Sequence, residues 1–384
     1  MSHKATNQSG EIMGFNAEFA RTRSSMKIQA AVLHQPNEKI RIETVDLAEP
    51  KHDELLVKIV ACGVCHTDAV QIKGAGYYPI VLGHEASGIV EAISDGVTDF
   101  QIGDHVVLSY NSCGECEACK DDRPFDCEHF RHLQFRGLRL DATSPLSING
   151  RTVATFFGQG GFATYSVCSV RNAVKIDPKL DLRMMAPLGC GVQTGAASVL
   201  IYFKPKPNES IAIFGAGSVG LSAILAAKVA GCSPIIAVDL IESRLELARE
   251  FGATHVINAK TTPDILAALR GITESLQYVL DTSGNQHLLD VGVEVLGENG
   301  KGGQVARGGE VHLSDRDIEM GKTWIHLVEG RAVPQMFIPQ MIELWRKGRF
   351  PFDRMITYFV FSKVNEAFEA SRNGTVVKPV LIMS

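Results

Sequence analysis

Four cysteines lie close together in the stretch CGECEACKDDRPFDC, which runs from Cys113 to Cys127. They are Cys113, Cys116, Cys119 and Cys127, in C-x2-C-x2-C-x7-C spacing. Four thiolates complete a closed tetrahedral shell around a structural zinc ion and leave no open position for catalysis. An iron–sulfur cluster is the alternative, because four-cysteine sites bind both groups. The spacing therefore predicts a metal site that is structural in type.

A second set of metal-binding residue types is spread along the chain. ACGVCHTD contains Cys62 and Cys65, LGHE contains His84 and Glu85, and PLGCGVQTG contains Cys190. A Cys, a His and a distant Cys form a three-ligand zinc site with one open position, which is the catalytic arrangement. A redox pair of Cys62 and Cys65 is the alternative, but no thioredoxin-like βαβ pattern surrounds it. We interpret the remaining cysteines as buried small hydrophobic residues. These are Cys62, Cys168 and Cys232.

A glycine pattern follows a strand-like run in SIAIFGAGSVG. Gly215, Gly217 and Gly220 have G-x-G-x-x-G spacing, and Asp239 ends the next apolar run. In dinucleotide-binding folds these glycines make the turn, admit the pyrophosphate and let helix and strand pack closely. An acidic residue at the position of Asp239 accepts hydrogen bonds from the adenosine ribose and repels the extra phosphate of NADP. A helix-capping loop with a surface aspartate is the simpler alternative. We favour NAD binding. Hydride chemistry needs no one-electron carrier, so zinc is favoured over iron–sulfur for the four cysteines.

Two kinds of element are needed to position these residues. Residues 29–107 contain short apolar or alternating runs separated by Gly, Pro and Asp, which predicts an antiparallel, β-rich domain. From about Pro187 to Gly330 strands and helices alternate, which predicts a doubly wound parallel sheet and hence an α/β fold. The tail contains a helix over 337–348, a strand over 355–361 and a helix over 363–374.

Composition narrows the classes of function. The chain has 384 residues, 45% of them hydrophobic, and a net charge of -5, with no Lys/Arg-rich run. These values suit a soluble protein of two domains and argue against nucleic acid as a partner. No apolar stretch approaches the ~18 residues that span a bilayer, so we expect no membrane partner. Residues 1–25 are polar and lack a secretory signal, so we expect a flexible arm and a cytoplasmic protein.

The motifs in this order resemble the zinc-dependent medium-chain alcohol dehydrogenases, from about Met26 to the C-terminus. GHE, the four-cysteine stretch, PLGCG and GAGSVG carry the resemblance. FFGQGGFATYSV, PLGCGVQTGA and EGRAVPQMFIPQMIELWRKGRFPFDRMI are similar to the aryl-alcohol (benzyl-alcohol) branch. The resemblance implies a GroES-like catalytic domain over 26–191 and 330–384 and a Rossmann domain over 192–329. It also implies two zinc ions per chain, NAD, and a homodimer or homotetramer.

The resemblance also implies roles for individual residues. Cys65, His84 and Cys190 would hold the catalytic zinc, with Glu85 as an alternate ligand. Asp68 would orient His84, and Thr67 would hydrogen-bond the substrate hydroxyl and help to remove its proton. The residues expected at the cofactor are His66, Thr194, Gly215, Gly217, Gly220, Asp239, Arg244 and Lys378.

The expected activity is interconversion of primary alcohols, aryl or allylic such as benzyl alcohol, with aldehydes by hydride transfer to or from NAD. Tyr77, Tyr78 and Tyr110 are candidates for lining an apolar pocket. Two alternatives stay open: a branch acting on polyols or hydroxymethyl-glutathione, and a non-enzymatic NAD- or zinc-binding protein. Two departures from relatives concern Val70, where many carry a proton-relaying histidine, and the loop VARGGEV, where they have a Gly/Pro turn.

Overall fold

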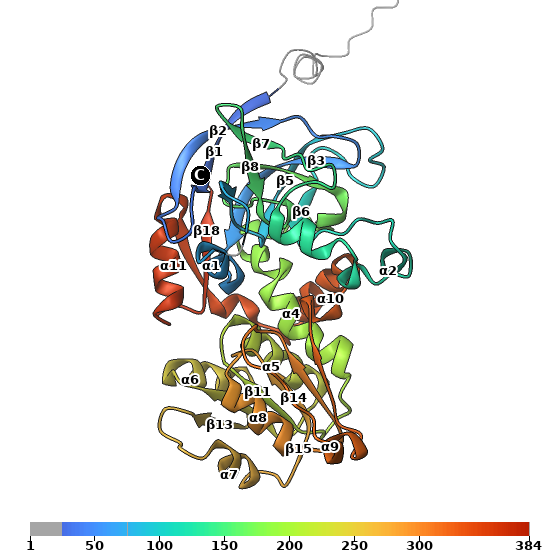
Figure 1. Cartoon of the computed structure of the whole chain (residues 1–384), viewed down its shortest axis with the longest axis vertical. Helices are drawn as coiled ribbons and strands as arrows, with labels where there is room; N and C mark the ends of the chain where they lie inside the picture. The colour runs from blue at the N-terminus through green and yellow to red at the C-terminus, as the bar shows by residue number, and fades with distance from the viewer. Residues whose placement is uncertain (1–24, 75, 384) are drawn as a thin grey trace, which may run out of the picture.

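The structure is a computed structural model that describes residues 25–74 and 76–383. A β-rich part and a parallel-sheet part lie one above the other, with helix α4 (Gly191–Ala197) between them (Figure 1). The flexible arm expected at 1–25 lies outside the described residues, except for Ser25, which begins the first strand. The predicted α/β fold with two kinds of sheet is confirmed.

The β-rich part consists of a closed barrel and a seven-stranded sheet. The barrel has the order β1-β2-β7-β8-β4. Its strands are β1 (Ser25–Leu33), β2 (Arg41–Ala48), β7 (Leu146–Ile148), β8 (Arg151–Thr155) and β4 (Ile80–Val81). The sheet has the order β10-β6-β5-β3-β18-β17, and β9 pairs with β3. Its strands are β10 (Ala173–Ile176), β6 (His105–Leu108), β5 (Ala86–Ile93), β3 (Glu54–Gly63), β18 (Lys378–Ile382), β17 (Ile356–Val360) and β9 (Tyr165–Ser169).

Most ladders of this part are antiparallel, as predicted, but two are not. β4 pairs with β8 in parallel, and β17 pairs with β18 in parallel. The second pair arises because α11 (Val364–Arg372) joins β17 to β18, and a helical crossover connects parallel neighbours. Through β18, which pairs with β3, the C-terminal segment is built into the sheet that also carries β3, β5 and β6.

The other part is a six-stranded parallel sheet in the order β13-β12-β11-β14-β15-β16. Its strands are β13 (His255–Asn258), β12 (Ile235–Asp239), β11 (Ile211–Phe214), β14 (Leu276–Asp281), β15 (Leu296–Gln304) and β16 (Thr323–His326). Its helices are α5 (Ser218–Ala230), α6 (Glu242–Phe251), α7 (Ile265–Arg270), α8 (Gln286–Val295) and α9 (Asp315–Glu319). The doubly wound arrangement is as predicted.

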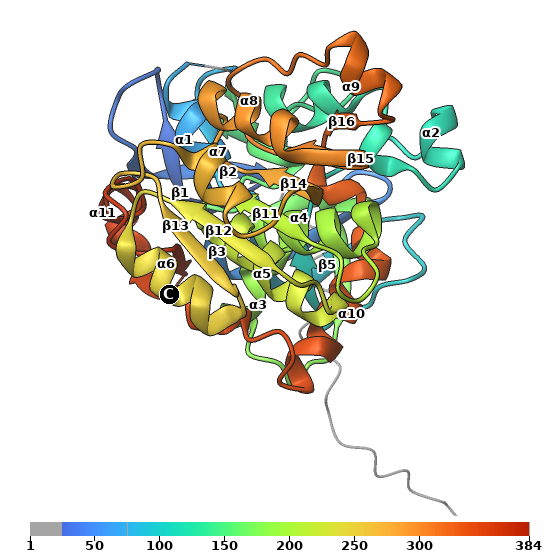
Figure 2. The same cartoon turned by 90° about the horizontal axis from the view of Figure 1, so that it is seen from below.

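Helices cover both faces of this sheet (Figure 2). In β11, Ile211 and Ile213 pack in the core that contains α5 and α6, whereas Ala212 and Phe214 pack in the core that contains α7 and α8. Successive side chains of a strand point to opposite faces, so a run of four apolar residues serves two hydrophobic cores. The continuous apolar run IAIF thus predicts a strand buried on both sides.

Five further α-helices belong to the β-rich part or to the junction. They are α1 (His66–Ile72), α2 (Glu117–Lys120), α3 (Leu182–Met185), α10 (Pro334–Arg346) and α11. Among the described residues, no single helix has the length and apolar character needed to cross a membrane. Only a pair bent by 56°, Leu182–Gly189 with Gly191–Phe203, meets that test when its two halves are combined.

Candidate active site and metal centres

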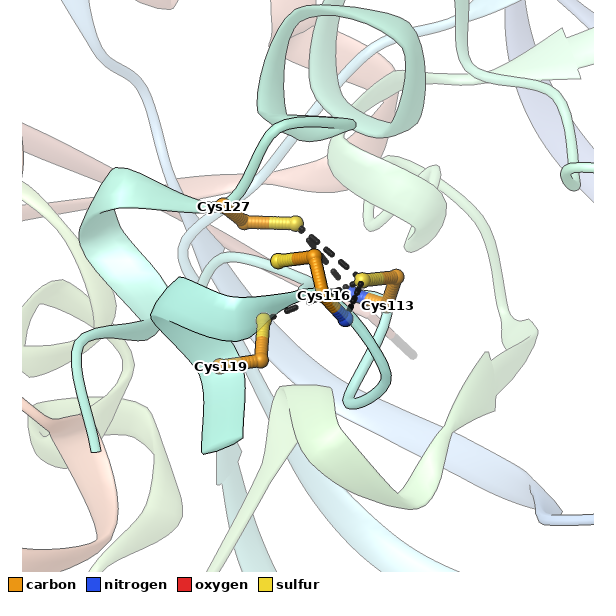
Figure 3. Close-up of side chains that lie close together, drawn as sticks. All are labelled: Cys113, Cys116, Cys119 and Cys127. Atoms are coloured by element: carbon orange, nitrogen blue, oxygen red, sulfur yellow. Dashed lines mark hydrogen bonds between the residues drawn. The ribbon is translucent and has the colours of Figure 1, made fainter. Parts of the chain in front are cut away.

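The tetracysteine lobe, residues 113–127, brings all four predicted cysteines together. The sulfur atoms of Cys113, Cys116, Cys119 and Cys127 lie within 4.8 Å of one another (Figure 3). A short helix, α2, carries one of the four, and a left-handed Gly114 (φ +75°) turns the chain between the first two. The sequence predicted a loop around an ion, and the structure shows this loop to contain a helical turn.

Backbone N–H groups in this lobe point at the sulfurs. Those of Glu115 and Cys116 donate to Cys113 Sγ at 3.4 and 3.3 Å, and that of Cys113 donates to Cys127 Sγ at 3.4 Å. The backbone N–H of Glu128, followed by that of Cys119, lowers the pKa of Cys116 to about 6, while burial raises the pKa of Cys127 to about 12. Donors aimed at sulfur favour the thiolate form that a metal requires. The lobe therefore fits a metal ion.

A second cluster forms where three chain segments meet. One ligand atom each from Cys65, His84, Glu85 and Cys190 lies within 4.8 Å of the others. Cys65 precedes α1, His84 and Glu85 precede β5, and Cys190 precedes α4. We call these four residues the mixed cluster. Among residues 25–74 and 76–383, it and the tetracysteine lobe are the two groups with this geometry.

Asp68 holds the imidazole of His84 in place. Its Oδ1 lies 3.0 Å from His84 Nδ1 and accepts the backbone N–H of Gly83 at 3.0 Å, and its Oδ2 accepts that of Cys65 at 3.1 Å. Because a carboxylate only accepts, Nδ1 carries the proton of the neutral His84 ring, and in that ring Nε2 keeps a lone pair. Nε2 is buried and has no hydrogen-bond partner within the described ranges. This orphaned atom, facing two thiols, fits a metal ion.

Glu85 forms an ion pair rather than standing free beside the cysteines. Both of its oxygens lie 2.9 Å from Lys378 Nζ, and Oε1 also accepts the backbone N–H of Gly191 at 3.1 Å. Burial raises the pKa of Glu85, which Lys378 partly offsets. Burial lowers the pKa of Lys378, but Glu85, Cys65 and Cys190 together raise it by more, so its ammonium stays charged. The pair places a buried cation next to the mixed cluster.

The structure places the other residues of the CHTD motif on α1. Thr67 Oγ1 lies 3.6 Å from Cys65 Sγ, on the side of the mixed cluster. His66 and Val70 are exposed, Val70 at 38%. A valine has no polar atom with which to pass on a proton, so a path through this position would need solvent. Thr67 is thus the hydroxyl that α1 brings to the cluster.

The glycine turn between β11 and α5 has the expected geometry. Gly215 has a φ of +93°, which a side chain rarely adopts, and a Cβ on Gly220 would lie 1.8 Å from the Gly215 carbonyl oxygen. A Cβ on Gly217 would meet no atom within 4 Å, so this position faces open space. Only the middle glycine is therefore free to meet a ligand, and the turn fits a pyrophosphate.

Asp239 closes this turn from the next strand. Its Oδ2 accepts the backbone N–H of Ala216 at 2.6 Å, and its Oδ1 accepts that of Ile241 at 2.9 Å. Each oxygen keeps a lone pair for a ribose hydroxyl. Arg244 lies on α6, just beyond, and its Nε is buried without a hydrogen-bond partner in the part of the chain that the structure describes.

The two parts of the molecule meet at Gly191. A Cβ there would lie 3.2 Å from Ser218 Oγ of the glycine turn and 3.4 Å from Lys378 Nζ. Lys378 therefore lies next to the turn as well as next to Glu85. Thr194, one turn further along α4, is buried and donates its hydroxyl to Glu329 Oε2 at 3.3 Å.

Glu329 is a site residue that the sequence did not single out. Its Oε1 lies 3.7 Å from Cys190 Sγ, and Oε2 accepts Gln193 Nε2 at 3.4 Å. Burial, opposed by His84, raises the pKa of this carboxyl to about 7. No pattern within the EGR segment marks this glutamate, because a buried acid needs a partner and this partner is distant in the sequence. Cys190, 139 positions earlier, is such a partner.

Phenylalanines, rather than the candidate tyrosines, pack on the imidazole. His84 stacks on Phe157 with ring centroids 4.4 Å apart and meets Phe156 edge-on at 5.3 Å. Half-buried Phe130 and Phe135 contact Phe157 from its outer side. Tyr110 is buried and bonds the Ala332 carbonyl. The three cysteines interpreted as bystanders, Cys62, Cys168 and Cys232, are buried in the hydrophobic cores.

Comparison with known proteins agrees with this geometry. Residues 51–178 match the alcohol dehydrogenase GroES-like domain, and residues 218–345 match the zinc-binding dehydrogenase domain. Geraniol dehydrogenase of Castellaniella defragrans is 40% identical over 369 residues, which cover 94% of this chain and 99% of that protein. The chain belongs to the zinc-dependent medium-chain alcohol dehydrogenases. Its resemblance to the aryl-alcohol branch is supported as well.

Two further relatives of this alcohol dehydrogenase, one of them with a solved structure, match nearly the whole chain. Benzyl alcohol dehydrogenase from Acinetobacter calcoaceticus is 41% identical with a TM-score of 0.89, covering 94% of this chain and all of the other. The S-(hydroxymethyl)glutathione dehydrogenase of Haemophilus influenzae is 32% identical, covering 95% of this chain and 99% of that protein. Two metal clusters in one chain are compatible with two zinc ions in an enzyme of this family.

Proposed function

We propose that this alcohol dehydrogenase interconverts primary aryl or allylic alcohols and their aldehydes with NAD. The observation that carries the proposal is the His84 imidazole, oriented by Asp68 between two cysteines and packed against a layer of phenylalanines. Apolar rings beside the metal position favour a substrate whose reacting carbon is attached to a flat, apolar group. The similarity to geraniol and benzyl alcohol dehydrogenases supports the same substrate class.

The residues divide the work among them. Cys65, His84 and Cys190 would hold the catalytic zinc with Glu85 as alternate ligand, and the tetracysteine lobe would hold a structural zinc. Zinc supplies a Lewis acid and NAD a hydride acceptor when they are bound. The Thr67 hydroxyl, beside Cys65, accepts the proton of the substrate hydroxyl at its Oγ1 and at the same time passes its own proton on to solvent. The phenylalanine layer keeps water from the reacting carbon.

The cofactor lies across the junction in this proposal. The pyrophosphate would meet Gly217 and the start of α5, with Gly215 and Gly220 shaping the turn, and His66 and Lys378 would approach it from the β-rich part. Asp239 and Arg244 hold the adenosine ribose, and Thr194 the nicotinamide end. The sheets support domain limits of 26–191 with 330–384 and of 192–329. We propose a homodimer or homotetramer.

One alternative is S-(hydroxymethyl)glutathione as substrate, which the 32% identical relatives favour. Steady-state assays with benzyl alcohol and geraniol, set beside ethanol, sorbitol and S-(hydroxymethyl)glutathione, each with NAD and with NADP, separate the candidates. We expect kcat/KM to be highest for benzyl alcohol or geraniol with NAD. A higher value for S-(hydroxymethyl)glutathione would refute the substrate class, and turnover of none of them would refute the activity.

A further inference from the structure

A short segment links the two metal centres from the outside of α4. It is η7 (Glu329–Arg331), which follows β16 and leads into α10. Its three residues have φ values of +49°, +62° and +59°, and no other three successive residues in 25–74 and 76–383 are left-handed. For the two residues other than glycine this backbone is strained, and such strain persists only where the surroundings hold it. The contacts of each residue show what holds it.

Glu329 faces the first turn of α4. Its carboxylate contacts the thiol of Cys190 and accepts hydrogen bonds from the side chains of Gln193 and Thr194. These three residues begin the helix that carries a predicted metal ligand and a predicted cofactor contact. A single buried carboxylate therefore ties the position of Cys190 to that of Thr194.

Gly330 fixes the distance between this segment and α4. A Cβ at this position would lie 2.6 Å from Ala197 Cβ, 2.7 Å from the Thr194 carbonyl oxygen and 2.8 Å from the Ser198 nitrogen. The chain therefore lies directly on the helix, and a shift of the segment shifts Glu329 with it.

Arg331 ends the segment on the tetracysteine lobe. Its two terminal nitrogens donate to the two carboxylate oxygens of Asp126 at 3.2 and 2.9 Å, and its guanidinium lies 4.5 Å from the centre of the Phe125 ring. Both partners lie between Cys119 and Cys127. A bidentate pair fixes direction as well as distance, unlike a single contact between point charges.

We propose that Glu329 is a positioning residue for the first turn of α4 and that Arg331 couples it to the tetracysteine lobe. The lobe thereby helps to set the geometry of the cofactor side of the active site. The inference rests on the proposed assignment of Thr194 to cofactor binding. Because Arg331 and Glu329 act as one unit, the effects of replacing them do not add.

The test is a double-mutant cycle on Glu329→Gln and Arg331→Met, read as the NADH dissociation constant by fluorescence and as kcat and KM for NAD. Each single variant should weaken NADH binding by roughly 2- to 30-fold, the usual range for coupling through a packed network. The double variant should lose no more NADH affinity than the single variant that binds NADH more weakly. Arg331→Lys should recover part of the loss, because one ammonium contact replaces two.

Arg123→Met is the matched control. Arg123 also pairs with Asp126, at 3.2 Å, but it is exposed and makes its other ion pair with Asp121. Its replacement should leave NADH affinity unchanged. Asp126→Asn should reproduce the effect of Arg331→Met from the lobe side. All variants should keep the metal content of the parent protein.

Three results would overturn the proposal. The first is a double variant whose fold-loss of NADH affinity is the product of the two single losses. The second is a loss of NADH affinity in Arg123→Met equal to that in Arg331→Met. The third is loss of metal from Arg331→Met, which would mean that the lobe itself had opened. A parent protein that binds NADH but oxidises no alcohol would refute the proposed function instead, and the cycle on NADH affinity would still decide the coupling.

Discussion

At the scale of single residues, two aspartates organise the site by using both carboxylate oxygens. Asp68 is fully buried and accepts from two backbone N–H groups and His84. Asp239 is half-buried and accepts from the backbone N–H groups of Ala216 and Ile241. A buried carboxylate is costly unless its lone pairs are satisfied, so each position tolerates few other residues.

Asp68→Asn should weaken metal binding at the mixed cluster. The amide nitrogen would face N–H donors instead of accepting from them, so His84 would lose its fixed tautomer. Loss of such a partner costs about 10- to 100-fold in metal affinity. Competition with a chromophoric chelator measures it. Asp281→Asn, also at a fully buried carboxylate but on β14, is the control and should leave metal affinity unchanged. Equal effects would mean that Asp68 serves the fold alone.

Asp239→Ser should relax the preference for NAD over NADP. The change removes the negative charge that would face the additional phosphate, so the ratio of kcat/KM values should fall by at least about tenfold, or about 1.4 kcal/mol. Asp239→Asn keeps the shape of the side chain and removes its charge, so it distinguishes the effect of the charge from that of the hydrogen bonds. A parent protein that uses both cofactors equally would show that Asp239 serves the turn and not the cofactor.

At the scale of elements, periodicity and short motifs predicted those helices, strands and loops whose structure depends mainly on their own local sequence. The strand predicted over 355–361 and the helix predicted over 363–374 agree with β17 and α11. The tetracysteine spacing predicted its cluster because all four ligands lie within one short loop, so their clustering does not depend on distant parts of the fold. The parallel pairing of β17 with β18 was missed, since register between distant segments depends on tertiary packing.

The same limit applies to the site. Glu329 and the phenylalanines beside His84 were missed because their role depends on neighbours far away in the sequence. Phe157, for example, is left-handed with a φ of +56°, which no local pattern announces for a bulky residue. Glu85 was expected as an alternate ligand, and its ion pair with Lys378 emerges only when β18 joins the sheet.

Cys116→Ser should remove one metal ion and destabilise the protein. Three remaining thiolates cannot close the shell, and binding free energy at a structural metal site is folding free energy. We expect loss of about one ion per chain and a midpoint of thermal unfolding several degrees lower. Cys232→Ser, at a buried cysteine outside both clusters, should keep its metal. A Cys116→Ser protein that melts like the parent yet turns over no substrate would assign the lobe to catalysis.

Asp317→Asn tests the capping box that Asp317 forms with Ser314 at the N-terminus of α9. The ammonium of Lys322 at 2.8 Å, with Ser314, lowers the pKa of Asp317 to about 2. A lowered pKa stabilises the fold fully above the ordinary value of about 4, and the contribution is lost as the pH falls toward 2. The variant should be less stable at pH 7 by about 1 kcal/mol, typical of a lost helix cap.

Urea unfolding at pH 7 and at pH 3 measures this difference. It should be smaller at pH 3, because part of the contribution of Asp317 is then gone from the parent protein. Asp315→Asn changes the same charge in the same helical turn at an exposed position and should have little effect at either pH. A difference for Asp317→Asn that does not change with pH would contradict the assigned pKa.

At the scale of the whole molecule, function depends on the junction between the two parts. The mixed cluster belongs to the β-rich part, the glycine turn to the parallel sheet, and α4 lies between them (Figure 1). Gly191 brings Glu85, Lys378 and Ser218 within contact distance of one point. The mixed cluster and the glycine turn lie on opposite sides of this junction, so we expect a variant that loses the metal of the mixed cluster still to bind the cofactor.

Metal analysis of Cys190→Ser, combined with NADH binding and benzyl alcohol oxidation, tests the central claim most directly. The parent protein should contain two zinc ions per chain and oxidise the alcohol. The variant should contain one, bind NADH with unchanged affinity by fluorescence, and lose turnover by at least about 1,000-fold, since the Lewis acid is gone. A variant that keeps two zinc ions and full turnover, or a parent protein that contains iron or a single ion, would contradict it.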